Sequence, residues 1–380
     1  TLPEDFSVTT LFEDHQGAVW LGTLKKGLFR FSDQTLESVP TSHHAISSIY
    51  EDREKNIWVG TNGGGLNLIL PRTASLTGPS GGLPFSSVRS TACDSSGRIW
   101  ATSLNGQLAY RESGQWHFFE SLPENVLVNC VTSDQQGQLW LGTRRHGILK
   151  INSDHSISDV TTDSHLSSSP IRSIFSASNG DLWFALKTPS QLFVLRNKTI
   201  TQIEKSVKFG PIRAMAETSD GTLWLGSSDG LLLRLEGDQI IDESSLDGPV
   251  NYSIRTLHAT PDNSLWIGYA GEGLGHLKDG TLRRFTTEDG LYDDYLSQIQ
   301  HDNNGGLWIA SNRGLFQVRL EHLLSDSSHL YCQIYGRNKS LPSIQPSRDF
   351  APSSSRDQDG RLYFSTHNGL LEVKPDDPNN

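Results

Sequence analysis

Residues 14–23 read Asp14-His15-Gln16-Gly17-Ala18-Val19-Trp20-Leu21-Gly22-Thr23, and Gly27-Leu28 follows them. Variants of this stretch recur along the chain, each anchored by one aromatic residue: Trp20, Trp58, Trp100, Trp140, Trp183, Trp224, Trp266, Trp308 and Tyr363. Successive anchors lie 38 to 55 residues apart. This period matches the roughly 40–50 residues of a four-stranded propeller blade and exceeds that of a leucine-rich or ankyrin repeat. The sequence therefore predicts an all-β protein, a β-propeller with nine repeats of about 42 residues.

Each repeat has the composition of strands joined by tight turns. In the second repeat, the β-branched run at residues 46–50 leads to an aspartate turn, and residues 57–61 form a second run. The turn pairs an aspartate, which can hydrogen-bond its own backbone, with a glycine that tolerates positive φ. Lys55 and Asn263 stand where two repeats lack the glycine. A second glycine, such as Gly27, marks the turn into the third strand.

The uninterrupted period favours a single propeller domain over residues 1–380, closed as one nine-bladed ring. A seven-bladed ring with two extra blades is the alternative. We expect blades at residues 1–44, 45–86, 87–126, 127–169, 170–210, 211–252, 253–294, 295–350 and 351–380. Residues 351–355 make a poor inner strand, and no outer strand follows Val373, so the last blade is expected to be incomplete.

Composition limits the partners and the chemistry. The net charge is −11 and no long basic run occurs, so nucleic-acid binding is not expected. The sequence contains neither an apolar run of membrane-spanning length nor a leader pattern. Cys93, Cys130 and Cys332 form no CxxC pair, which favours free thiols over a disulfide or a zinc site. We expect no metal and no other cofactor.

The pattern Asp-x-x-Gly-x-Ile/Leu-Trp-x-Gly-Thr followed by Gly-Gly-Leu resembles the two-component regulator propeller repeat. Residues 51–66 are nearly its consensus, and the resemblance extends over essentially the whole chain. It implies an extracytoplasmic or periplasmic sensor region of a bacterial histidine kinase or diguanylate cyclase, in a family with several carbohydrate-binding members. It also implies a C-terminal β-sandwich, an output module or another partner protein. The expected ligand is a carbohydrate or another small anionic solute.

Propeller geometry indicates where a ligand would bind, because residues near the beginnings of the inner strands line the mouth of the central channel. The second residues of the first eight predicted inner strands are Thr9, Ser47, Arg89, Asn129, Arg172, Arg213, Arg255 and Ser297. Four of these eight are arginine, although arginine makes up only 21 of the 380 residues. Guanidinium groups bind carboxylate, sulfate or phosphate in bidentate fashion. The predicted ligand-binding residues are Arg89, Asn129, Arg172, Arg213, Arg255, Arg144, Arg145 and His146.

An arginine row at one register can equally be a ladder of contacts between blades, and both interpretations stay open here. Catalytic signals are weak, since the chain has no His-Glu-x-x-His, no Gly-x-Ser-x-Gly and no phosphate-binding loop. We therefore predict no enzyme and no catalytic residues. The leading hypothesis is a ligand sensor, with a protein-binding scaffold as the alternative and a polysaccharide lyase or hydrolase as a third.

Overall fold

The computed structural model describes residues 6–32, 34–52, 55–69, 73–152, 154–161, 166, 169–246, 252–325, 329–336, 341 and 343–375. Within these residues, antiparallel strands form nine sheets, and the only α-helix is the short α1 (Leu320–Leu324). Contacts divide the chain into two compact units. The first, called here the two-sheet unit, lies within residues 1–73, and the second, the seven-sheet unit, is Ala74–Pro375.

The two-sheet unit contains one sheet of four strands and one of three. Their strands are β1 (Val8–Glu13), β2 (Val19–Thr23), β3 (Leu28–Ser32) and β4 (Thr35–Val39), then β5 (Ile46–Glu51), β6 (Ile57–Thr61) and β7 (Gly65–Ile69). The inner strands β1 and β5 pack together, and the Thr9 hydroxyl donates to the Ile46 carbonyl at 2.7 Å. The buried core between the sheets is small and consists of Trp20, Leu28, Ile46, Ile57 and Val59.

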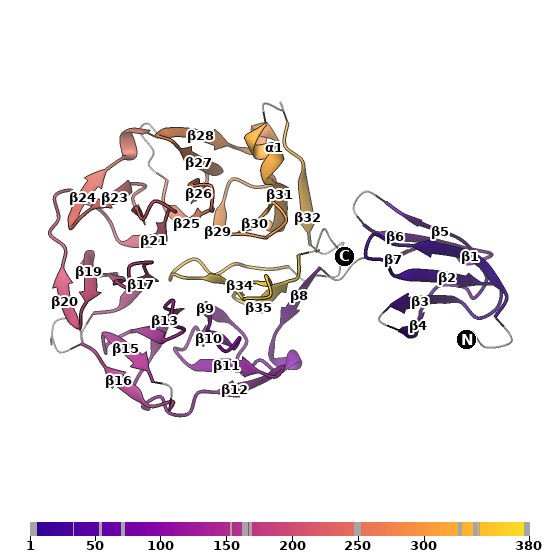
Figure 1. Ribbon diagram of the computed structural model, residues 1–380, viewed down its shortest axis with the longest axis horizontal. Helices are drawn as coiled ribbons and strands as arrows, with labels where there is room; N and C mark the ends of the chain where they lie inside the picture. Colours follow the sequence, from indigo (N-terminus) through magenta and orange to yellow (C-terminus); the bar gives the residue numbers. More distant parts are fainter. Residues whose placement is uncertain are drawn as a thin grey trace. The chain divides into compact units, whose positions relative to one another are not determined.

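The seven-sheet unit repeats the same four-stranded sheet seven times (Figure 1). Its first three complete sheets are β9 (Val88–Cys93), β10 (Ile99–Ser103), β11 (Leu108–Glu112), β12 (Gln115–Phe118); β13 (Val128–Ser133), β14 (Leu139–Thr143), β15 (Ile148–Ile151), β16 (Ile157–Asp159); and β17 (Ile171–Ser176), β18 (Leu182–Leu186), β19 (Gln191–Arg196), β20 (Thr199–Gln202). The next three are β21 (Ile212–Glu217), β22 (Leu223–Ser227), β23 (Leu232–Glu236), β24 (Gln239–Asp242); β25 (Ile254–Ala259), β26 (Leu265–Tyr269), β27 (Leu274–Lys278), β28 (Thr281–Phe285); and β29 (Leu296–His301), β30 (Gly306–Ser311), β31 (Gly314–Arg319), β32 (Cys332–Tyr335). The seventh combines β33 (Ser354–Arg356), β34 (Leu362–Thr366) and β35 (Gly369–Val373) with β8 (Ala74–Thr77).

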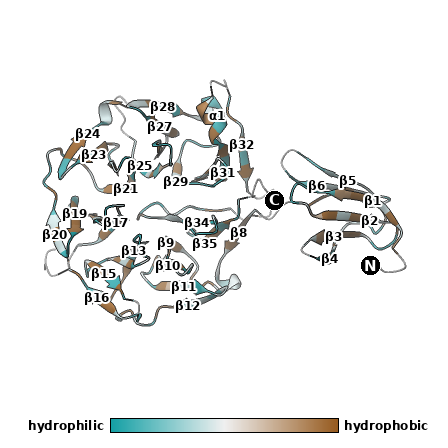
Figure 2. Ribbon diagram, in the orientation of Figure 1, coloured by the Kyte–Doolittle hydropathy of each residue, from teal (hydrophilic) through white to brown (hydrophobic). Residues whose placement is uncertain are grey.

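The seven inner strands follow one another around a ring, and the last, β33, packs against the first, β9. Polar contacts join the same two sheets: the Ser90 hydroxyl donates to the Pro352 carbonyl at 2.5 Å, and Arg111 pairs with Glu372 at 2.9 Å. Apolar side chains of adjacent sheets fill the layers between them, and Figure 2 shows these brown residues along the strands. Such layers allow a propeller to leave only short, protected edges.

Nine repeats are confirmed as nine sheets, but they do not close as one nine-bladed ring. The predicted second blade, residues 45–86, has only three strands in its own sheet, β5, β6 and β7. The fourth strand of this range, β8, pairs instead with β35, from Ala74↔Val373 to Thr77↔Leu370. This pairing completes the last blade, which the sequence leaves without an outer strand. The arrangement is the alternative of seven blades with two extra. The ranges 1–44 and 87–350 divide into blades that each contain the strands of one sheet, and the range 351–380 contains three of its four, β33, β34 and β35. Residues 1–5 and 376–380 lie outside the described residues.

The repeated aspartate organises the turn between inner strand and tryptophan strand. The Asp14 carboxylate accepts from the backbone N–H groups of Gln16 and Ala18 at 3.0 and 2.9 Å and from the Trp20 indole at 2.7 Å. Equivalent indole bonds reach Asp52, Asp94, Asp134 and Asp302, and Asp357 accepts from the Tyr363 hydroxyl. Lys55 and Asn263 adopt φ of 65° and 66°, as their position in place of glycine predicts.

The three cysteines are free. Burial raises the pKa of the Cys93 and Cys130 thiols to about 12, so neither forms a reactive thiolate at neutral pH. Within the described ranges, no helix has the length and hydropathy to span a bilayer.

Candidate functional site

The second residue of each inner strand from β1 to β29 is a β-bulge residue. Pairing with the neighbouring strand skips one position there, for example between Val88 and Ser90. The skipped residues are Thr9, Ser47, Arg89, Asn129, Arg172, Arg213, Arg255 and Ser297. A bulge leaves its extra residue out of the ladder and re-aims its side chain. The residues predicted at the starts of the inner strands are therefore the ones that the backbone leaves out of strand pairing.

Arg89 and Asn129 form a buried link between neighbouring blades. The Arg89 guanidinium donates to the Asn129 side-chain oxygen at 2.7 Å and to the Leu104 carbonyl at 2.6 Å. The Asn129 amide donates in turn to the Ile171 carbonyl at 3.1 Å. The ring of Phe350 lies 4.5 Å from the Arg89 guanidinium carbon. For these two residues the contacts match the ladder interpretation.

Arg172, Arg213 and Arg255 have far fewer partners. Arg172 is 3% exposed, yet its Nε and Nη2 atoms have no hydrogen-bond partner among the described residues, and the same holds for Arg213 Nε and Arg255 Nη1. Arg213 Nη1 donates to the Arg348 carbonyl at 3.1 Å. No carboxylate of the described part of the chain forms a salt bridge with any of the three. We call these three residues the bulge arginines.

Uncompensated charge shows in the pKa values of the bulge arginines. Burial and the neighbouring Arg213 lower the pKa of Arg172 to about 10. Burial, Arg348 and Arg213 lower the pKa of Arg255 to about 10. These guanidinium groups stay protonated at neutral pH, so the cluster is cationic. Few carboxylates of the described residues lie near enough to stabilise this charge. The carboxylate of Asp349 raises the pKa of Arg172 and of Arg213, but it lies too far from both guanidinium groups to form an ion pair.

Residues 346–352, called here the channel segment, cross the ring next to the bulge arginines. Ala351 donates its N–H to the Arg172 carbonyl and accepts from the Ile174 N–H, both at 3.1 Å. At the other end, the Ser347 hydroxyl donates to the Val88 carbonyl at 2.5 Å. The backbone carbonyl of Ser347 accepts from the Gln298 side-chain amide at 2.7 Å. The segment brings Arg348 and Asp349 to the cluster. Sequence reasoning missed both, because nothing in this loop indicates that it enters the channel.

Arg144, Arg145 and His146 occupy the turn between β14 and β15. Arg144 and Arg145 are exposed, and Arg144 is close enough to Arg89 to lower its pKa, after the larger effect of burial. The backbone N–H of His146 donates to the Thr143 hydroxyl at 2.7 Å, and the buried Nδ1 of its ring has no partner in the part of the chain that the structure describes. Among the described contacts of this turn, that of Arg144 with Arg89 is the one that reaches the predicted row.

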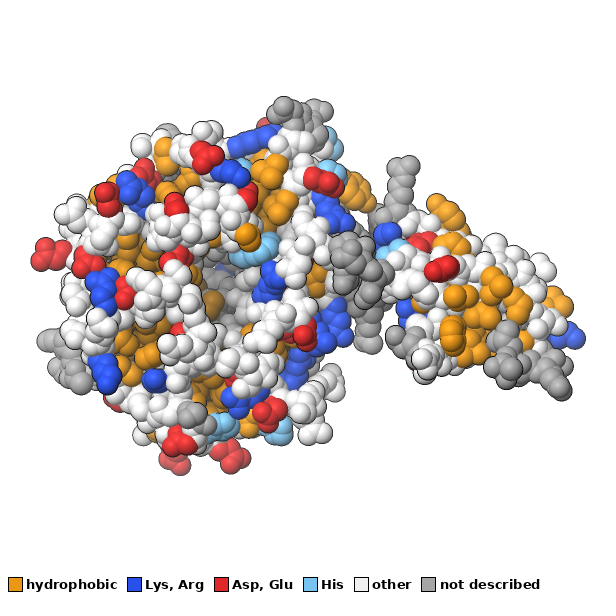
Figure 3. Space-filling model, in the orientation of Figure 1, with side chains coloured by type: hydrophobic (Ala, Val, Ile, Leu, Met, Phe, Trp, Pro, Cys, Tyr) orange, Lys and Arg blue, Asp and Glu red, His pale blue; other side chains and the backbone are white. Residues whose placement is uncertain are grey.

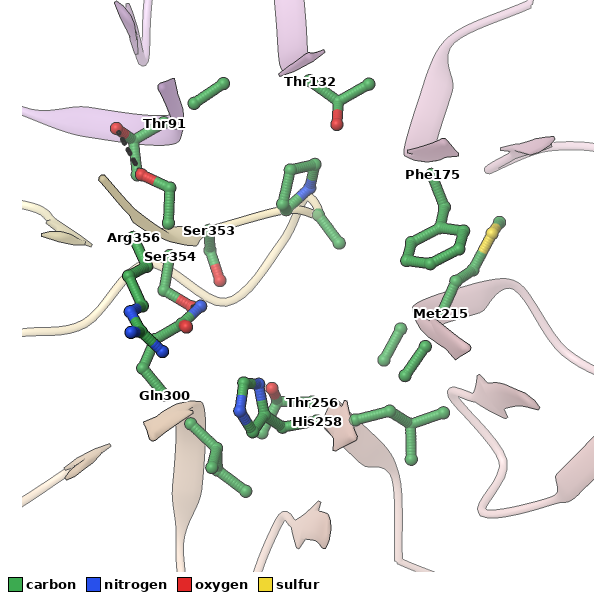
Figure 4. Close-up of a pocket in the computed structure, with 18 of the residues that line it drawn as sticks. Thr91, Thr132, Phe175, Met215, Thr256, His258, Gln300, Ser353, Ser354 and Arg356 are labelled. Atoms are coloured by element: carbon green, nitrogen blue, oxygen red, sulfur yellow. Dashed lines mark hydrogen bonds between the residues drawn. The ribbon is translucent and has the colours of Figure 1, made fainter. Parts of the chain in front are cut away.

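A cavity of about 400 Å³ lies in the channel, bounded by the inner strands and by residues 351–356. Figure 3 shows a hollow in the middle of the seven-sheet unit, with histidine and basic side chains beside it. In Figure 4, Phe175 and Met215 lie on one side of the cavity, and Gln300, Ser354 and Arg356 lie on the other. Arg255 also lines it, so the cavity adjoins the bulge arginines.

Two histidines and an arginine form a hydrogen-bond chain beside the cavity. His258 Nε2 lies 2.7 Å from His301 Nδ1, and His301 Nε2 lies 3.2 Å from Arg356 Nη1. Burial, followed by the charges of His301 and Arg356, lowers the pKa of His258 to about 3, so its imidazole is neutral. The sequence signal for this pair is weak: the two histidines lie 43 residues apart, about one repeat, among thirteen scattered histidines. Within the described residues, no cluster of three or more His, Cys, Asp or Glu could hold a metal ion.

The profile described as "Two component regulator propeller" matches residues 1–25, 42–63, 121–145 and 206–229. The chain carries two-component regulator propeller repeats. The matched residues include the anchors Trp20, Trp58, Trp140 and Trp224. Comparison with curated protein sequences gave no match.

Solved structures built like these repeats include two from B. thetaiotaomicron. The extracellular domain of the hybrid two component system BT3049 is 22% identical, with a TM-score of 0.67 over 97% of this chain and 51% of its own. The extracellular domain of the one component system BT4673 is 16% identical, with a TM-score of 0.60 over 97% of this chain and 52% of its own. This chain thus spans about half the length of each domain.

A third similar structure is an enzyme. A catalytically inactive variant of virginiamycin B lyase from Staphylococcus aureus, with quinupristin, is 14% identical, with a TM-score of 0.60 over 80% of this chain and 99% of its own. At such identities these likenesses show the propeller fold alone.

Proposed function

We propose that this chain is the ligand-sensing part of an extracytoplasmic two-component-type receptor, and that it binds an anionic solute such as an acidic oligosaccharide at the bulge arginines. The observation that carries the proposal is the group of buried guanidinium nitrogens of Arg172, Arg213 and Arg255 that have no hydrogen-bond partner among the described residues. Leaving a buried donor unpaired is costly, more so when it is charged. An anion that accepts from these atoms would remove this cost.

The shape and charge of the site support an anionic ligand over a neutral one. Guanidinium groups present paired donors that match planar carboxylate or sulfate groups. Arg213 and Arg255 are half-buried and Arg348 is exposed, so the cluster faces both protein and solvent. A concave cationic site focuses its field even on a chain whose net charge is −11. Arg89, Asn129, Arg144, Arg145 and His146 complete the proposed binding region around this centre.

The receptor assignment draws on the repeats and on the similar extracellular domains of BT3049 and BT4673. In this proposal the propeller passes its signal to an output domain or a partner protein. We also propose that the chain is not catalytic. Among the described residues that line the cavity, the only carboxylate is that of Glu217, and Ser178 binds it through its N–H and hydroxyl at 2.6 Å.

The test measures binding of paired neutral and acidic sugars, glucose with glucuronate and chitobiose with a sulfated disaccharide, by calorimetry and thermal shift. We expect an acidic member to bind, to bind more weakly as NaCl rises, and to lose about 10- to 100-fold in affinity in Arg213→Gln or Arg255→Gln. Arg283→Gln, on the exposed outer strand β28, is the matched control and should bind normally. If both bulge-arginine variants bind every acidic probe with the affinity of the wild type, the proposed site is wrong.

A further inference from the structure

We propose that the channel cavity is a second ligand site, which takes an uncharged cyclic solute rich in hydroxyl groups. The inference does not depend on the anion site, because it uses other side chains and favours an uncharged ligand. The cavity volume of about 400 Å³ falls within the roughly 300–1,000 Å³ that is typical of small-molecule sites.

The charged side chains away from the bulge arginines already have partners. Both oxygens of Glu217 accept hydrogen bonds from Ser178. Arg356 donates to His301 at 3.2 Å and to the side-chain oxygen of Asn303. Arg255 reaches the cavity from the start of β25, where its charged neighbours are Arg348, Arg213 and Asp293. A ligand in the rest of the cavity therefore meets mainly neutral groups.

The histidine chain fixes one hydrogen-bond donor at the cavity. A guanidinium only donates, so His301 Nε2 must accept from Arg356 and His301 carries its proton on Nδ1. That N–H donates to His258 Nε2 at 2.7 Å, which leaves the proton of neutral His258 on Nδ1. No hydrogen bond to His258 Nδ1 is found among the described residues, and the ring projects into the cavity (Figure 4).

Other neutral side chains around the cavity also keep polar atoms without a partner among the described residues. Gln300 uses its amide nitrogen to donate to Ser354 at 3.0 Å, which leaves its carbonyl oxygen as an acceptor. The hydroxyls of Thr132, Thr256 and Ser353 line the cavity and have no side-chain hydrogen bond within the part of the chain that the structure describes. Hydroxyls both donate and accept. The same versatility is a property of a polyol, so ligand and wall can satisfy each other in several pairs.

The opposite wall is apolar. Phe175 and Met215 lie together there (Figure 4), and Leu257 and Pro352 are also among the residues that line the cavity. A solute with hydroxyl groups on its edge and C–H groups on one face fits both the polar wall and the apolar wall. Its C–H groups can pack on the aromatic side chain, and none of its polar atoms is then buried without a hydrogen bond. Acyclic or fully polar solutes lack the flat apolar face. This two-sided lining is the reason to propose a cyclic polyol.

The experiment uses the whole chain and a fixed set of neutral probes: glucose, galactose, xylose, cellobiose and myo-inositol. We expect at least one to raise the melting temperature and to bind with a dissociation constant that is unchanged between 50 and 500 mM NaCl. Gln300→Leu and the nearly isosteric Thr132→Val should each weaken that binding about tenfold. Gln202→Leu, on the exposed outer strand β20, is the matched control and should bind like the wild type.

Arg213→Gln separates this site from the anion site. Neutral-probe affinity that survives Arg213→Gln while Gln300→Leu lowers it supports a second site. The proposal is overturned if no neutral probe binds to the folded chain at millimolar concentration. It is equally overturned if Gln300→Leu and Thr132→Val both fold and bind a neutral probe as the wild type does.

Discussion

In six of the nine described sheets, one aspartate ties the turn to the aromatic residue of the second strand. Asp134 accepts from the N–H groups of Gln136 and Gln138 at 3.0 and 2.9 Å and from the Trp140 indole at 2.9 Å. Asp134→Ala removes all three acceptor contacts and should lower the free energy of unfolding by about 2–4 kcal/mol. Asp134→Asn keeps an oxygen for the two N–H groups and should cost less. Urea unfolding of both variants checks this order; equal losses would mean that the two backbone N–H contacts contribute nothing.

His258 should make stability fall in mild acid. Its pKa is lowered to about 3 in the folded protein, by burial and then by His301 and Arg356, against about 6.5 when unfolded. Above pH 6.5 neither state is protonated, so the histidine has no effect. As the pH falls from 6.5 toward 3, only the unfolded state gains the proton, and stability drops by up to about 1.4 kcal/mol per pH unit.

The variant His258→Gln isolates this effect from other titrating groups. The pKa of His301 is also lowered, by burial and Arg356, while Asp302 and Asp262 oppose that shift. We expect the stability difference between wild type and variant, measured by urea unfolding from pH 4.5 to 7, to change with pH in favour of the variant at low pH. Parallel curves would show that His258 is protonated equally in both states.

At the scale of the element, most strands could be predicted because each repeat encodes its own hairpins. The inner strands β9 to β29 begin at the predicted residues, and the aspartate and glycine turns lie where the pattern puts them. Local signals of this kind depend on neighbours in sequence. The arginine row was predicted by the same reasoning, but its bulges were not, since a one-residue register shift leaves no composition signal.

Elements that depend on distant partners could not be predicted. β8 follows β7 in the sequence at the spacing of an ordinary fourth strand, yet it pairs with β35 almost 300 residues later. The channel segment looks like a loop, yet Ala351 hydrogen-bonds to β17 across the ring. The hydrogen bonds of Arg89 and Arg172 also depend on residues of other blades. Arg89 donates to Asn129 on the next blade, whereas none of the described residues hydrogen-bonds to Arg172 Nε or Nη2.

At the scale of the whole molecule, the two units should differ in their ability to fold alone. The seven-sheet unit has apolar layers around a full ring, whereas the two-sheet unit has one small core. The two-sheet unit also leaves large apolar side chains exposed by 62–65%: Leu11, Tyr50 and Leu66. Buried area is the main favourable term in folding, so a unit with little of it is marginal.

We expect a chain of residues 74–375 to fold with a cooperative thermal transition, because it retains β8 and every sheet of the ring. A chain of residues 78–375 lacks only β8, exposes the edge of β35 and should melt at least about 5 °C lower or aggregate. Circular dichroism melting and size-exclusion chromatography compare the two. If both melt at the same temperature, the four residue pairs between β8 and β35 do not stabilise the ring, and closure must come from the packing of β33 on β9.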